Sequence, residues 1–245
     1  SDSRMRATKH GALLMAGLAT KTVLRVSGLA TTGKTLVLVR HGISEMNVAL
    51  SRQRWGSPGF KDPDIRDAPL TEEGRREALG RRPDVARVEK IDVILTSPLT
   101  RALETTELAL GEKILASTPV VATALASERV YLSSDLGSTR DALTERFPNV
   151  DFSELPSDDW WWTPADGGSA EEWRPPGTYA CPGEPHDAFV QRMQRLLDYL
   201  GNRPEHSIAL VCHWGVIAAL TGKSFRNCEI QQLALPDRLH GRTVP

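Results

Sequence analysis

Residues 36–47 read Leu-Val-Leu-Val-Arg-His-Gly-Ile-Ser-Glu-Met-Asn, and this stretch decides the fold. It begins with an apolar run that is typical of a buried strand and ends abruptly at Arg40 and His41. A helix that begins soon after His41 would add the positive potential of its first backbone amides. A cation and an imidazole fixed at a strand end suit a dianionic ligand such as a phosphate. The alternative is an Arg-His pair that only caps a strand.

The composition is that of an ordinary soluble protein. The chain has 245 residues, of which 40% are hydrophobic and 25% are charged, so it can form one large α/β domain or two small ones. Its net charge of −1 gives no overall field that would favour nucleic acid or an acidic membrane. Any anion site must therefore be a local concentration of positive charge. No segment is long enough to span a membrane, and we expect a cytoplasmic protein.

Three cysteines occur in the chain, and an odd, low count gives no disulfide framework. This count fits a reducing compartment, and none of the cysteines has metal-ligand spacing with another. They are Cys181, Cys212 and Cys228.

The first 33 residues form an extension of unusual composition. No acidic residue occurs from Ser3 to Ser44, whereas six Arg and Lys residues precede the Arg40–His41 pair. A basic, acid-free segment with Ser and Thr is typical of an organelle transit sequence. The alternative is a short extra strand at residues 22–26, where apolar and polar residues alternate.

Apolar runs and helical periodicity alternate along the rest of the chain. This order predicts a three-layer α/β/α fold with a mostly parallel central sheet, whose ligands bind beyond the carboxyl ends of the strands. We expect one domain over residues 34–245, with a cap-like insertion of loops and helices at about 130–182 over these strand ends. The expected strands cover residues 36–39, 91–95, 119–122, 207–212 and 228–235. The expected helices cover residues 47–54, a segment from Thr71, and residues 99–110, 138–147, 187–200 and 216–220.

Two later segments place similar side chains after further strands. Ser97-Pro98-Leu99-Thr100-Arg101 follows one strand, and His213-Trp214-Gly215 follows another. With the pattern Arg-His-Gly-x-Ser-x-x-Asn that begins at Arg40, they resemble the three blocks of the histidine phosphatase superfamily, branch 1. The resemblance covers roughly residues 34–235 and implies a phosphoglycerate-mutase-like fold.

The resemblance implies that Arg101 binds phosphate and that His213 is the second histidine of the site. The chemistry agrees, because a phosphomonoester carries close to two negative charges and an arginine can grip its oxygens bidentately. We expect Arg40 to act in the same way, and protonated His213, Asn47 and Ser44 to donate further hydrogen bonds. The sequence has no P-loop and no obvious carboxylate cluster for magnesium, so we expect neither a metal nor another cofactor.

His41 is the predicted nucleophile. A backbone carbonyl, that of Gly42, would hold the proton of one ring nitrogen and leave the other nitrogen to attack phosphorus. The product would be a phosphohistidine that water hydrolyses. We also expect Gly42 and Trp214 to lie at the substrate pocket.

Glu128 is the candidate general acid that protonates the leaving alkoxide. Members of the resembled family carry this acid in the middle region after the third strand, where Glu128 stands. Its pKa would have to be raised by burial or by neighbouring carboxylates. The alternative is a surface Glu paired with Arg129, and the rival acids are Glu104, Asp135 and Glu171.

The predicted function is metal-independent hydrolysis of a small phosphorylated metabolite. Two alternatives stay open: a phosphoglycerate mutase-type phosphotransferase, and a catalytically weak relative that binds phosphorylated ligands or partners. The segment Ser127-Glu128-Arg129-Val130-Tyr131 departs from the Glu-Arg-His-Tyr-Gly that the mutases typically carry, which favours a phosphatase. Neither the substrate nor the oligomeric state follows from the sequence.

Overall fold

A computed structural model describes residues 33–53, 59–156, 160–161 and 183–240. Within these residues, five strands form one sheet in the order β3-β2-β4-β1-β5. The strands β1 to β4 are parallel, whereas β5 pairs antiparallel with β1 at one edge. The strands are β1 (Thr35–Arg40), β2 (Val93–Thr96), β3 (Val120–Ala122), β4 (Ser207–Cys212) and β5 (Ile230–Ala234).

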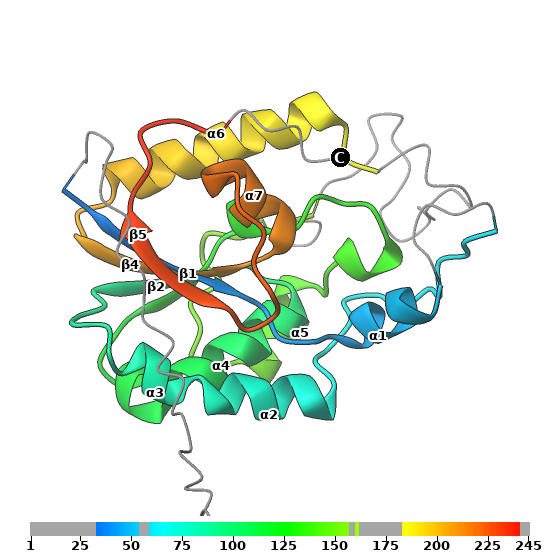
Figure 1. The fold of residues 1–245 in the computed structure, drawn as a ribbon, viewed down its shortest axis with the longest axis horizontal. Helices are drawn as coiled ribbons and strands as arrows, with labels where there is room; N and C mark the ends of the chain where they lie inside the picture. The colour runs from blue at the N-terminus through cyan, green and yellow to red at the C-terminus, as the bar shows by residue number, and fades with distance from the viewer. Residues whose placement is uncertain (1–32, 54–58, 157–159, 162–182, 241–245) are drawn as a thin grey trace, which may run out of the picture.

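Helices cover both faces of the sheet (Figure 1). Helices α6 and α7 lie on one face, and α2, α3 and α4 lie on the other (Figure 1). The α-helices are α1 (Glu45–Arg52), α2 (Glu72–Gly80), α3 (Arg82–Val85), α4 (Thr100–Leu115), α5 (Arg140–Arg146), α6 (His186–Asn202) and α7 (Trp214–Thr221). Two 3-10 turns, η1 (Ala124–Ala126) and η2 (Ser133–Asp135), follow β3.

The alternation of side chains along β1 explains why both faces need cover. Leu36 and Leu38 are buried in the cluster beneath α6 and α7, whereas Val37 and Val39 are buried in the cluster on the α4 side. A strand that is apolar on both faces reads as a continuous hydrophobic run, as residues 36–39 do. The predicted three-layer α/β/α fold with a mostly parallel sheet is therefore confirmed.

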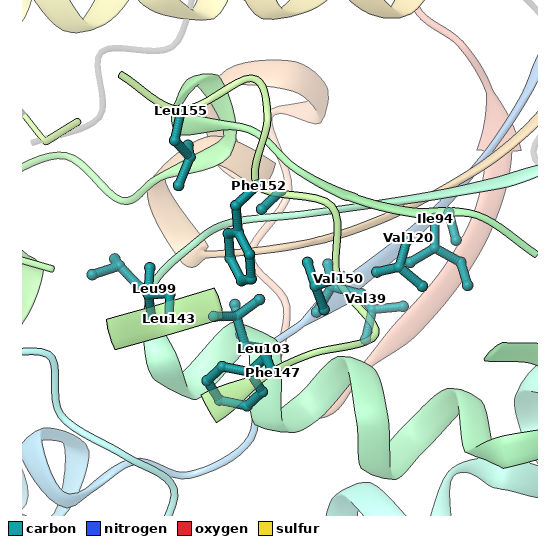
Figure 2. Packing of buried hydrophobic residues seen from close by; sticks show 14 of the residues in the cluster. Val39, Ile94, Leu99, Leu103, Val120, Leu143, Phe147, Val150, Phe152 and Leu155 are labelled. Atoms are coloured by element: carbon teal, nitrogen blue, oxygen red, sulfur yellow. The ribbon is translucent and has the colours of Figure 1, made fainter. Parts of the chain in front are cut away.

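The described part of the 130–182 segment shares the core on the α4 side of the sheet. Figure 2 shows Leu143 of α5 and Phe147, which follows that helix, with Phe152 and Leu155, beside Leu99 and Leu103. The same hydrophobic cluster holds Trp160 and Trp161 together with residues of β1, β2 and β4. This part of the segment is thus continuous with the main core of the domain.

Local capping explains where two of the helices begin. Ser44 caps α1, so the helix starts at Glu45, two residues before the predicted start at Asn47. Thr71 caps α2 as expected, because its hydroxyl accepts a hydrogen bond from the N–H of Gly74.

The N-terminal extension and the question of a membrane-spanning helix remain to be compared with the sequence predictions. The predicted extension lies outside the described residues except for Gly33, so the transit and strand interpretations both remain predictions. Among the described residues, no helix combines the length and the apolar character that crossing a membrane requires.

Candidate active site

The carboxyl ends of three parallel strands bring the predicted site residues together. Because β4 lies between β1 and β2, His41 after β1 and His213 after β4 become neighbours, and Arg101 follows β2 at the start of α4. The N–H of His41 donates to the carbonyl of Cys212, and the two imidazole ring centroids lie 5.0 Å apart. We call Arg40, His41, Arg101 and His213 the anion cage.

His41 has the tautomer that a nucleophile requires. The residue is 4% exposed, and its Nδ1 lies 2.7 Å from the carbonyl oxygen of Gly42, which can only accept a hydrogen bond. Burial, followed by the charges of Arg101 and Arg40, lowers the pKa of His41 well below its usual range. The imidazole is therefore neutral, with the proton on Nδ1 and the lone pair on Nε2.

His213 is fully buried, and its Nε2 lies 2.7 Å from the hydroxyl oxygen of Ser97. Its Nδ1 makes no hydrogen bond with any described residue. Burial and the neighbouring cations, Arg101 first, lower the pKa of His213 well below its usual value. The protonated His213 of the sequence prediction therefore needs an anion beside it, because only a nearby negative charge would offset these effects.

The two cage arginines are held in different ways. Arg40 donates from Nη1 to the carbonyl of Phe225 at 2.5 Å, and its buried Nε has no partner among the described residues. Arg101 donates to the carbonyl of Ser134 at 2.6 Å and to Oδ1 of Asp135 at 2.8 Å. The side chains of Arg101 and Asp135 are only 5% and 6% exposed, so this ion pair fixes the guanidinium.

Glu128 lies beside the turn that carries His213. Its carboxylate accepts from the N–H of Gly215 at 3.1 Å and from the N–H of Arg129 at 3.0 Å. Burial, and then the nearby Asp135, raise the pKa of Glu128 above its usual range, which is the direction a general acid needs. A Cβ on Gly215 would lie 2.3 Å from Oε1 of Glu128, so the glycine makes room for the carboxylate.

The alternative reading of Glu128 does not match these contacts. The guanidinium of Arg129 donates to the carbonyl of Glu184 and to the hydroxyl of Tyr131, and the arginine is not the charge partner of Glu128. The rival Glu104 is bound by Arg75 and Arg146, which suits a structural role.

Of the other two candidate acids, Asp135 and Glu171, the structure describes only Asp135. Asp135 is paired with Arg101. Glu171 lies outside the described residues.

Arg192 and Glu184 hold the turn that carries Glu128, and sequence reasoning missed both. Arg192 of α6 donates to the carbonyls of Leu125, Ser127 and Glu128 at 3.0, 2.7 and 3.3 Å. It also makes a two-point ion pair with Glu184, at 2.9 and 2.6 Å. These contacts join residues 64–67 positions apart, so no local pattern could reveal them.

Ser44 and Asn47 form the capping box of α1. The hydroxyl of Ser44 accepts from the N–H of Asn47, whose side-chain oxygen accepts from the N–H of Ser44. Asn227 donates to the carbonyl of His41 at 3.0 Å, to that of Gly42 at 3.2 Å and to Oδ1 of Asn47 at 3.3 Å. Sequence reasoning missed Asn227, which ties the first block to the segment before β5.

The two weak pocket residues have packing roles. A Cβ on Gly42 would lie 3.0–3.2 Å from Gly74, Cys228 and Leu70, so this glycine permits close packing of the first block. Trp214 packs against the core cluster beneath α6 and α7 and donates from Nε1 to Ser224 at 2.9 Å. No group of three or more His, Cys, Asp or Glu side chains that could hold a metal ion occurs among the described residues.

Comparison with known proteins assigns the family. The family model for "Histidine phosphatase superfamily (branch 1)" matches residues 36–235. This chain belongs to that family. The match includes all three blocks and Glu128, and members of the superfamily are phosphatases or phosphomutases.

This chain matches individual relatives over a shorter stretch. It is 35% identical over 101 residues to a 2,3-bisphosphoglycerate-dependent phosphoglycerate mutase of Bartonella quintana, covering 40% of this chain and 44% of that enzyme. The mutase of the same name from Staphylococcus haemolyticus is 40% identical over 98 residues, covering 39% of this chain and 38% of that enzyme. The chain thus spans less than half the length of these curated relatives.

A solved structure, Bacillus stearothermophilus YhfR, has the same fold. It superposes with a TM-score of 0.51 at 22% identity, covering 84% of this chain and 94% of that one.

Proposed function

We propose that this protein hydrolyses phosphomonoesters of small metabolites without a metal ion, through a phosphohistidine on His41. Arg40 and Arg101 would bind the phosphate oxygens, and His213 would become protonated beside the dianion and stabilise it. Ser44 and Asn47 are used by the helix cap, so their contribution to phosphate binding is secondary in this proposal.

One observation carries the proposal. Two buried imidazoles with ring centroids 5.0 Å apart lie between the buried Arg101 and the half-buried Arg40, and the Nδ1 of His41 is committed to a carbonyl. The buried Nε of Arg40 and Nδ1 of His213 have no hydrogen-bond partner among the described residues. Buried nitrogen groups without partners are costly, and an oxyanion would satisfy them. The arrangement combines a neutral nucleophile with an anion site.

The reaction would have two balanced steps. In the first, Nε2 of His41 attacks phosphorus, the bond from phosphorus to the leaving oxygen breaks, and Glu128 gives its proton to that oxygen. In the second, water attacks the phosphohistidine, the P–N bond breaks, and the Glu128 carboxylate takes a proton from the water. The sum is an alcohol and inorganic phosphate, with His41 and Glu128 restored.

A phosphomutase is the second candidate, and the similarity to phosphoglycerate mutases favours it. A mutase would pass the phosphoryl group from His41 to a second alcohol, whereas a phosphatase passes it to water. Incubation with 3-phosphoglycerate and 2,3-bisphosphoglycerate separates the two. Release of inorganic phosphate without 2-phosphoglycerate supports hydrolysis, and isomerisation that outpaces phosphate release would establish the mutase.

The nucleophile is tested by covalent labelling. Acid-quenched wild-type protein incubated with para-nitrophenyl phosphate should gain one phosphoryl group by intact-mass spectrometry, and His41→Ala should lose both the label and turnover. A matched control is His206→Ala, since His206 lies on the surface before β4. A label that persists on another residue of His41→Ala would exclude this assignment. Turnover should also survive EDTA, and loss of turnover that added Mg²⁺ restores would contradict the metal-free reaction.

A further inference from the structure

The segment at residues 225–229, directly before β5, lies beside the strand end that carries the proposed nucleophile. β5 pairs antiparallel with β1, and Ile230 stands opposite Val39. The residues before Ile230 therefore continue past the carboxyl end of β1, where Arg40 and His41 stand. The antiparallel edge strand thus brings a further piece of chain to a site that is otherwise built on parallel strands.

Asn227 of this segment donates hydrogen bonds to the first block. Its Nδ2 lies 3.0 Å from the carbonyl oxygen of His41, 3.2 Å from that of Gly42 and 3.3 Å from Oδ1 of Asn47. A carbonyl oxygen can only accept, so the nitrogen of the amide must face these atoms. Asn47 agrees with this orientation, since its Oδ1 also accepts from the N–H of Ser44. Three acceptors surround two amide hydrogens, which leaves neither hydrogen for a phosphate.

The carbonyl of Gly42 is the acceptor that bears on catalysis. It also accepts from Nδ1 of His41 at 2.7 Å, the contact that leaves the lone pair on Nε2. A carbonyl oxygen has two lone pairs, so the ring can use one while Asn227 uses the other. The N–H of Gly42 is bound separately, by the hydroxyl of Thr105 at 3.0 Å. Asn227 therefore binds the same oxygen that sets the tautomer of His41.

None of the three acceptors depends on Asn227 alone. The carbonyl of His41 also accepts from the N–H of Cys228 at 3.2 Å, that of Gly42 from the His41 ring, and Oδ1 of Asn47 from the backbone at the cap of α1. Deleting the amide would leave no buried acceptor without a partner, so it should cost the fold little. What the amide adds is the direction in which the Gly42 carbonyl points.

The backbone that carries Asn227 is itself held in place. Arg40 bonds it on both sides, from Nη1 to the carbonyl of Phe225 at 2.5 Å and from its N–H to the carbonyl of Glu229 at 3.1 Å. Between these contacts, Cys228 has a φ of 54°, in the left-handed region that side chains rarely adopt. Strained residues persist where their surroundings over-determine them, and they cluster at functional sites. The amide of Asn227 thus reaches the first block from a fixed position.

We propose that Asn227 is a positioning residue for the nucleophile and acts through the carbonyl of Gly42. It keeps this oxygen directed at Nδ1 of His41, so the proton stays on Nδ1 and Nε2 stays free to attack phosphorus. The ring becomes cationic when Nε2 takes the phosphoryl group, and a fixed carbonyl then stabilises its Nδ1–H. The inference rests on the proposed phosphatase function for its effect on rate, whereas the tautomer belongs to the free protein.

The tautomer is measured by NMR of protein with isotope-labelled histidines, in which couplings to the ring carbon protons distinguish Nδ1–H from Nε2–H. The His41 signals are those that His41→Ala lacks. Wild-type protein should show the Nδ1–H form, and Asn227→Ala should show the Nε2–H form as well. Asn202→Ala is the matched control, because Asn202 is exposed at the end of α6.

Kinetics give the second measurement. Asn227→Ala should lower kcat/KM by about 10- to 100-fold for benzyl phosphate and para-nitrophenyl phosphate alike, since both esters meet the same nucleophile and a misplacement of about 1 Å can cost 100-fold. Inhibition by inorganic phosphate should match that of wild type, because the amide does not contact the anion. Asn227→Leu keeps the volume and deletes both donors, so it should behave in the same way and replaces Asn227→Ala if that variant does not fold.

An unchanged His41 tautomer or an unchanged kcat/KM in the folded variants would overturn the inference. Weaker inhibition by phosphate with the tautomer intact would also overturn it, because Asn227 would then be a phosphate ligand. If wild-type protein hydrolyses no ester, the proposed function fails and the NMR comparison alone decides. The Nε2–H form in the Asn227 variants would then support the inference, and its absence would refute it.

Discussion

Gly215→Ala should disable the proposed general acid, Glu128, while leaving the fold intact. The added Cβ would lie 2.3 Å from Oε1 of Glu128, whereas ordinary contacts to a Cβ begin at 3.4 Å. The carboxylate must therefore move by about 1 Å, and a misplacement of that size can cost about 100-fold in rate. The clashing atom is the end of a flexible side chain, so the backbone need not shift. The kcat/KM for benzyl phosphate should thus fall about 100-fold, within the range of general acid catalysis.

The leaving group separates this effect from general damage. Para-nitrophenolate departs with little protonation, so kcat/KM for para-nitrophenyl phosphate, which reports only the first step, should change only a few-fold. Gly201→Ala is the matched control, because nothing lies within 4 Å of a Cβ at that helical position, and it should keep full activity on both esters. A Glu128→Gln/Gly215→Ala double variant should be no slower than Glu128→Gln, since both changes remove the same function. Additive losses, or equal losses on the two esters, would refute the reasoning.

Two further predictions follow from the same loop. Arg192→Met leaves the buried Glu184 without its ion pair, so it should lower the free energy of unfolding, measured by urea denaturation, by about 3–5 kcal/mol. The double variant Arg192→Met/Glu184→Gln should recover part of that loss. An unchanged urea midpoint for Arg192→Met would contradict the stabilising role of this pair. Because burial and then the nearby Asp135 raise the pKa of Glu128, kcat/KM for the alkyl ester should fall as pH rises through that raised pKa, whereas kcat/KM for the aryl ester should not. Identical pH profiles for the two esters would argue against Glu128 as the acid.

The strands and the anion cage could be predicted because local patterns encode them. Arg40–His41, Arg101 and His213 each follow an apolar run, and parallel strands carry such residues to one edge of the sheet. The tautomer of His41 was predictable for the same reason, because the accepting carbonyl belongs to the next residue.

Contacts between segments that lie far apart in the sequence could not be predicted, because no local sequence pattern encodes them. Asn227 reaches the first block across 186 positions, and Arg192 reaches the turn at Glu128 from a polar position of α6 that resembles any solvated helix face. The helix pattern predicts only that such positions avoid the core, and it carries no information on which carbonyls they reach. The sequence suggested Asp135 only as a rival general acid. Its ion pair with Arg101 could not be predicted, since only the tertiary fold brings η2 to α4.

Asp135 connects the two halves of the site electrostatically. On one side, burial and then the positive charges of Arg101 and Arg40 lower the pKa of both histidines, and a nucleophilic histidine requires the neutral form. On the other side, the charge of Asp135 adds to burial in raising the pKa of Glu128, which an acid requires. Asp135 also neutralises part of Arg101, so it weakens the field that would otherwise lower the pKa of Glu128. A cationic cage and a carboxyl with a raised pKa can therefore lie side by side, because Asp135 pairs with Arg101 and acts on Glu128 as well.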